Sequence, residues 1–64
     1  MMKNFEYGTH FMYQNKEYVV VGEDITRNEI ECQTVPCDNE FYWFKVVDNN
    51  KVFKVKRNNN VSLQ

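Results

Sequence analysis

The chain has 64 residues, with eight basic and nine acidic side chains and a formal net charge of −1 at pH 7. It contains no Ala and a single Leu, whereas nine Val, five Phe and four Tyr favour pleated, half-buried strands over helices. This length and composition exclude a helical bundle, a multidomain enzyme and a transmembrane helix.

In chain order, stretches rich in β-branched and aromatic residues alternate with short polar segments, which is the pattern of strands joined by tight turns. We therefore expect an all-β fold, namely a small five-stranded antiparallel barrel of the SH3-like kind or a curled meander. It forms one domain over residues 1–57, followed by a flexible C-terminal tail at 58–64. The expected strands span residues 5–13, 17–21, 25–35, 41–47 and 51–57.

The segments between the strands carry turn-forming residues. The Gly-Glu-Asp segment at 22–24 predicts the turn before the third strand. Pro36 predicts a loop after that strand, because Pro disrupts a central strand. A short helical turn at 24–30 is the alternative to a simple turn, since Thr26 and Glu29 have the spacing of a capping box.

Two of the expected turns are short enough to set a strand register. If residues 15–16 form a two-residue turn, Tyr13 lies opposite Tyr18. If the later Asn-Asn step forms another, one face of the last hairpin is apolar and the other places Lys45 opposite Lys54, a like-charge pair that costs roughly 0.2–1 kcal/mol. The side chains expected in one core are Phe11, Tyr18, Val20, Ile30, Phe44, Val46, Phe53 and Val55.

Few residues in this chain suit catalysis or metal binding. There is one His and one Ser, and nothing in the sequence brings His10 close to Cys32 or Cys37. We expect two reduced thiols, one buried on the third strand and one in the following loop, with too few neighbouring ligands for zinc. We therefore expect no enzyme activity, no metal and no cofactor.

Charge is distributed unevenly along the chain. Residues 1–40 carry three basic and eight acidic side chains, a net of −5, whereas residues 41–64 carry five basic and one acidic, a net of +4. The expected register places Trp43 among the lysines of the last hairpin, and this combination of aromatic and basic groups suits a partner-binding surface. The residues expected to bind are Phe41, Trp43, Lys45, Lys54, Lys56 and Arg57.

The acidic side chains offer a second interpretation. Glu29 and Glu31 share one face of the third strand, and they would neutralise the lysines if that strand lies beside the fourth. Trp43 would then form a cation–π contact with Lys56. The alternative binding surface is acidic and consists of Glu23, Asp24, Glu29 and Glu31.

These observations favour a non-catalytic protein-binding module, of the type of small phage or mobile-element inhibitors that dock on and block a larger host protein. The alternative is a small β-barrel that binds nucleic acid through the basic and aromatic face of the last hairpin, although the nearly balanced net charge weighs against it. No segment has the pattern of a secretion signal or a membrane span, so we expect a cytoplasmic protein with no membrane contact.

Overall fold

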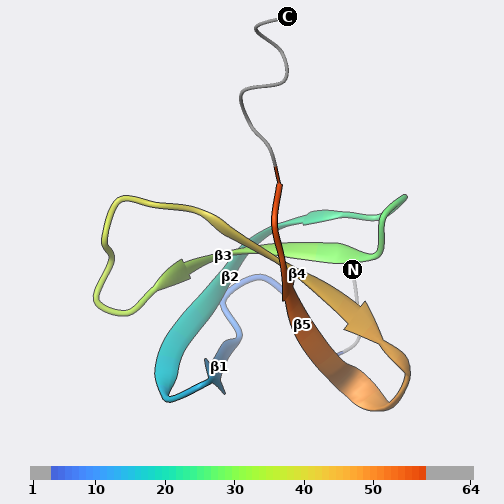
Figure 1. The fold of residues 1–64 in the computed structure, drawn as a ribbon, viewed down its shortest axis with the longest axis horizontal. Coiled ribbons are helices and arrows are strands. Elements are labelled where there is room, and N and C mark those ends of the chain that lie inside the picture. Colours follow the sequence, from blue (N-terminus) through green and yellow to red (C-terminus); the bar gives the residue numbers. More distant parts are fainter. Residues whose placement is uncertain (1–3, 58–64) are drawn as a thin grey trace, which may run out of the picture.

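A computed structural model describes residues 4–57, so the tail expected at 58–64 lies outside the described residues. Five antiparallel strands form one sheet in the order β1-β2-β3-β4-β5, and the sheet curls into a half-barrel (Figure 1). The expected all-β fold is therefore confirmed. The elements are β1 (His10–Tyr13), β2 (Lys16–Asp24), β3 (Glu29–Thr34), β4 (Tyr42–Val47), the 3-10 turn η1 (Asp48–Asn50) and β5 (Lys51–Val55).

The turns rest on residues with a left-handed backbone, a conformation that Asn tolerates better than most side chains do. Positive φ angles occur at Gln14, Asn15, Asn28, Asn39, Asn49 and Asn50, and every strand connection contains at least one of them. Five of these six residues are Asn, so Asn supplies most of the left-handed positions in the connections. Within residues 4–57, no helix is long and apolar enough to cross a lipid bilayer.

The turn between β1 and β2 lies one residue earlier than expected. Gln14 and Asn15 both adopt positive φ, so they form the two-residue turn, and Phe11 lies opposite Tyr18. The expected pairing of Tyr13 with Tyr18 is therefore wrong. The strand faces are nevertheless as expected, because the pairing moves by two residues and side chains alternate with that period.

The connection between β2 and β3 also differs from the expectation. The segment at 22–24 continues β2 through a bulge after Val20, and the turn lies at 25–28. Asp24 holds this turn, since its Oδ1 accepts hydrogen bonds from the Thr26 hydroxyl (2.8 Å) and the Arg27 N–H (3.3 Å). The Thr26 hydroxyl is thereby used within the turn, and the alternative of a helical turn at 24–30 is wrong.

The turn between β4 and β5 has three residues, Asp48–Asn50, where a two-residue turn was expected. Successive side chains of a strand point to opposite faces of the sheet, so this single extra residue reverses which side chains of β5 face the core. Lys45 lies opposite Phe53, and Lys54 lies opposite Phe44. The expected opposition of Lys45 and Lys54 is therefore wrong, and the like-charge repulsion that it implied is absent.

The reversal of β5 changes which of its side chains enter the core. Phe53 is 53% exposed, and Val55 lies half-buried opposite Trp43 on the outer face, so the expectation that both are core residues is wrong. Val52 packs against the core instead. The buried core residues are Phe5, Tyr18, Val20, Ile30, Cys32, Phe44 and Val46.

Phe44 lies at the centre of an aromatic cluster. Its ring centroid is 4.9 Å from Tyr18, 5.0 Å from Tyr13 and 5.2 Å from the half-buried Phe11, all in edge-to-face geometry. Such pairs contribute about 0.5–1.5 kcal/mol each beyond the area they bury. The inner face of β4 is thus the main source of packing in this small domain.

The two cysteines lie where the sequence predicts. Cys32 is fully buried on β3, and Cys37 is exposed in the following loop; both are free thiols. Burial raises the pKa of the Cys32 thiol to about 12. Cys32 therefore acts as a small core side chain with little tendency to ionise.

Candidate functional site

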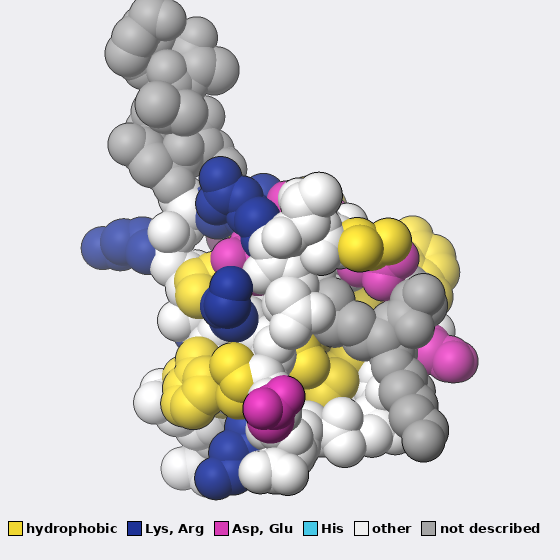
Figure 2. Space-filling model, turned by 90° about the vertical axis from the view of Figure 1, so that its right-hand side faces the viewer, with side chains coloured by type: hydrophobic (Ala, Val, Ile, Leu, Met, Phe, Trp, Pro, Cys, Tyr) yellow, Lys and Arg dark blue, Asp and Glu magenta, His cyan; other side chains and the backbone are white. Residues whose placement is uncertain are grey.

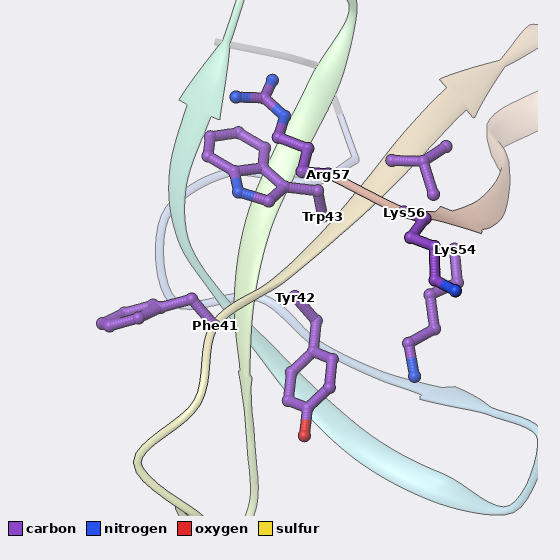
Figure 3. A pocket seen from close by; sticks show the side chains of 7 residues that line it. Phe41, Tyr42, Trp43, Lys54, Lys56 and Arg57 are labelled. Atoms are coloured by element: carbon purple, nitrogen blue, oxygen red, sulfur yellow. The ribbon is translucent and has the colours of Figure 1, made fainter. Parts of the chain in front are cut away.

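A groove lies where β4 begins and β5 ends. Trp43 and Val55 form the last pair between these strands, whereas Tyr42 pairs on its other side with Cys32 of β3. At this point a cavity of about 350 Å³ is lined by residues of both strands (Figure 3). The residues that line the groove are Phe41, Tyr42, Trp43, Lys54, Val55, Lys56 and Arg57.

The groove contains five of the six residues that were expected to bind a partner, and only Lys45 of that set lies outside it. In Figure 3, Trp43 and Arg57 lie on one side and Tyr42 points away from them, whereas Lys54 of β5 and Lys56, which follows that strand, lie on the right. Both faces of the hairpin contribute, because the groove lies at the end of the ladder.

Arg57 is held by three residues from other strands. Its Nη2 donates hydrogen bonds to Asp24 Oδ2 (2.8 Å) and Glu29 Oε1 (2.6 Å), and its Nε donates to the same Glu29 oxygen (3.0 Å). Its guanidinium carbon lies 3.5 Å from the centroid of the Trp43 ring. The Arg57 cluster, defined as Arg57, Asp24, Glu29 and Trp43, therefore joins the chain after β5 to β2, β3 and β4.

The Arg57 cluster resolves a repulsion that the sheet would otherwise contain. Asp24 and Glu29 lie directly opposite each other on β2 and β3, and like charges in that position destabilise a sheet. Arg57 binds both carboxylates and offsets one of their two negative charges, an internal compensation that the second interpretation of the sequence anticipated in part. That interpretation placed Lys56 on Trp43 and used Glu31, whereas the structure uses Arg57 and Asp24.

Asp24 makes the contribution of the cluster to stability depend on pH in the acidic range. The hydrogen bond from Arg57, followed by that from Thr26, lowers the pKa of Asp24 from 3.8 to about 2. A carboxyl with a lowered pKa stabilises the fold above its unfolded-state pKa, and this contribution is lost as the pH falls through the folded-state value.

We therefore expect the denaturant midpoint of the protein to fall between about pH 4 and about pH 2, and to fall less steeply in Asp24→Asn. Some dependence will remain, because the hydroxyl of Tyr42 also lowers the pKa of Asp38. Urea unfolding followed by circular dichroism at several pH values measures this. An identical acid response in the parent and in Asp24→Asn would contradict the assignment.

The two lysines of the groove are arranged differently from Arg57. Lys54 Nζ lies 4.6 Å from the centroid of the Tyr42 ring, and the Tyr42 hydroxyl donates a 2.6 Å hydrogen bond to Asp38 Oδ2. This bond raises the pKa of Tyr42 to about 12, so the ring stays neutral. Lys56 is exposed, and among residues 4–57 neither lysine forms an ion pair. These two charges are available to a partner.

Lys45 has a local role. It lies opposite Glu29 on β3 and Phe53 on β5, and its Nζ donates a 3.0 Å hydrogen bond to the Arg27 carbonyl in the turn between β2 and β3. The residue is exposed, but it is outside the groove and its ammonium is already engaged.

The four residues of the alternative acidic surface do not share one open face. Asp24 and Glu29 bind Arg57, and the Glu29 side chain is only 8% exposed. Glu31 lies opposite Trp43 and Gly22, where a Cβ on the glycine would come within 2.8 Å of the Glu31 carboxylate. Glu23 lies opposite Ile30, on the other face of the sheet.

No chemically reactive cluster accompanies the groove in the part of the chain that the structure describes. His10 Nδ1 lies 2.9 Å from Glu17 Oε2 on the exposed surface of β1 and β2. Among residues 4–57, no three His, Cys, Asp or Glu side chains gather as metal ligands would. The site offers aromatic and apolar contact surface with two cations beside it.

The fold and site define a small antiparallel half-barrel with an aromatic and basic groove at one end of its last hairpin. On the face seen in Figure 2, hydrophobic and basic side chains lie side by side, with carboxylates scattered among them. Comparisons with protein-family models, curated proteins and solved structures found no match. Functional inference therefore rests on the geometry of the groove.

Proposed function

We propose that this protein is a non-catalytic protein-binding module that docks on a larger protein through the groove. The observation that carries this proposal is a groove lined by three aromatic side chains together with two lysines that have no ion-pair partner within residues 4–57. Protein interfaces combine a desolvated aromatic centre with a charged rim in this way.

Exposed hydrophobic side chains near the groove support a protein partner. Phe41 is 54% exposed at the groove itself, and Phe53 is 53% exposed on the face of β5 that also carries Val55. Contiguous exposed apolar patches mark interaction sites, whereas single exposed residues do not. Phe53 lies two residues before Val55 of the groove on the same strand face, so it extends the apolar surface beyond the cavity.

The finer form of the proposal is inhibition. Docking would block a functional surface of a larger host protein, as small inhibitors encoded by phages and mobile elements do. A half-barrel of this size acts on a partner by occupying its surface, since the groove provides contact area and charge.

Binding of single-stranded nucleic acid is the second candidate. Its supporting observation is that three aromatic residues and two lysines line the same groove, since bases stack on aromatic rings next to basic side chains. The Arg57 charge, however, is compensated by Asp24 and Glu29. Two free lysines give a weak phosphate-binding surface, so we favour a protein partner.

The proposal predicts that charge reversal at the groove weakens docking. Lys54→Glu combined with Lys56→Glu should weaken the affinity for the partner by roughly tenfold or more, because two attractive charges become repulsive. The full chain, immobilised as bait, would be used to capture partners from a host lysate with and without nuclease. The captured protein would then be titrated against both versions of the chain.

The matched control is Lys16→Glu combined with Lys51→Glu, which changes the same charge at exposed positions outside the groove. A partner that survives nuclease, binds the control and is lost with the groove variant supports the proposal. Equal capture by the groove variant and the control would contradict it. A partner lost on nuclease treatment, with a steep dependence of affinity on salt, would favour the nucleic-acid candidate.

A further inference from the structure

The groove is large enough to receive an apolar side chain of a partner. Its volume of about 350 Å³ is at the low end of the roughly 300–1,000 Å³ typical of ligand pockets. Its walls consist of the rings of Phe41, Tyr42 and Trp43, the side chain of Val55 and the stems of the lysines. An apolar side chain that protrudes from a partner would lose water on most sides in this position.

The charged side chains around the groove determine which residues of a partner can flank that apolar side chain. Arg57 closes one wall, but its charge is satisfied by Asp24 and Glu29, at 2.8 and 2.6 Å. The Lys54 ammonium lies over the Tyr42 ring, 4.6 Å from its centroid, and the exposed Lys56 follows two residues later on the same side of β5. Among the residues that line the groove, the charges without an ion-pair partner within residues 4–57 are therefore those of the two lysines.

We propose that the groove binds an extended acidic peptide segment of the partner, with one apolar side chain in the cavity and flanking carboxylates bound by Lys54 and Lys56. This inference rests on the proposed function and adds the class of ligand. Successive side chains of an extended segment point to opposite sides, so an apolar residue enters the groove while acidic neighbours remain at its rim. The lysines and the carboxylates form charge-assisted hydrogen bonds.

Trp43 provides a direct readout, because it is the single Trp of the chain and part of the groove wall. The probe is a short synthetic peptide with one central leucine flanked by glutamates, acetylated and amidated at its ends. Titration of the full-length protein should change the emission of Trp43 and shift the amide resonances of Tyr42, Lys54 and Lys56.

Three matched comparisons test the parts of the proposal. The variant Lys54→Gln combined with Lys56→Gln should bind the peptide roughly tenfold more weakly, whereas Lys16→Gln combined with Lys51→Gln should bind as the parent does. A peptide with glycine in place of leucine should lose most of its affinity, because the cavity stays unfilled. A peptide with lysines in place of the glutamates should not bind.

Several results would overturn the proposal. These are a saturating peptide that leaves Trp43 and the groove amides unchanged, equal binding by the groove variant and the control, or equal binding of the glycine peptide. Tighter binding of an oligothymidylate than of the acidic peptide would identify nucleic acid as the ligand and overturn the proposal too. If the peptide fails but the captured partner still requires Lys54 and Lys56, the ligand class is wrong and the proposed function stands.

Discussion

Phe44→Ala is expected to unfold the protein at room temperature. Phe44 is fully buried and contacts the rings of Tyr18, Tyr13 and Phe11. Truncation of such a side chain costs about 3–5 kcal/mol through lost burial and the cavity left behind. A chain of this length has a free energy of unfolding of only a few kcal/mol, and at most about ten. The variant should therefore lose its near-UV circular dichroism and its cooperative melting transition.

Phe53→Ala is the matched control, since it removes the same atoms from the next strand. Phe53 is 53% exposed and lies opposite Lys45 on the outer face, so its truncation should change the free energy of unfolding by less than about 1 kcal/mol. The comparison also tests the register of the last hairpin. A two-residue turn would bury Phe53, and a loss of stability as large as that of Phe44→Ala would show that the hairpin has that register.

The faces of most strands could be predicted from the sequence because they depend only on alternation. Tyr18, Val20, Ile30, Phe44 and Val46 were expected in the core, and all five are buried. A register error of two residues at the first turn left these faces unchanged. The pattern of apolar residues is thus a stronger signal than the identity of any single turn.

The register of the last hairpin could not be predicted from the sequence. Two consecutive Asn fit the centre of a two-residue turn, and they fit equally well the final positions of a three-residue turn such as Asp48–Asn50. The number of residues in the turn decides which side chains of β5 face the core, and therefore whether Phe53 is buried or exposed. Local propensity does not distinguish the two turns, and the packing of β5 against the rest of the sheet does.

Five of the seven residues that line the groove belong to the set that was expected to bind a partner, for a reason that the structure explains. The groove lies at the end of the ladder between β4 and β5, where side chains from both faces of the hairpin line one cavity. The side chains of β5 were assigned to the wrong faces, yet of the six residues expected to bind only Lys45 lies outside the groove. The partners of Arg57 could not be predicted, because Asp24 and Glu29 are 33 and 28 residues away in the chain. The uneven charge distribution led to a second interpretation in which Glu29 and Glu31 neutralise the lysines, but it did not identify the pairing of Arg57 with Asp24 and Glu29.

The Arg57 cluster should be the second large contributor to stability. Removing one partner of a fully buried ion pair costs about 3–5 kcal/mol. The side chains of Arg57 and Glu29 are 22% and 8% exposed, so solvent reduces the cost, and we expect about 2–3 kcal/mol for Arg57→Ala. For a domain of this size that loss lowers the melting temperature by roughly 10–20 °C. Lys56→Ala, at the adjacent exposed position, should have almost no effect.

A double-mutant cycle separates the stability lost with the Arg57–Glu29 ion pair from the stability lost with the packing of Arg57 on Trp43. If Arg57→Ala destabilises mainly because the Glu29 carboxylate is left buried without a cation, it should cost much less when Glu29 is already Gln. Arg57→Lys should recover only part of the stability, since an ammonium cannot donate the same forked hydrogen bonds or stack flat on Trp43. Thermal unfolding of the four proteins of the cycle gives the coupling energy. A coupling near zero would show that Glu29 and Arg57 act independently, and the stabilising role of Arg57 would then lie in its contact with the ring.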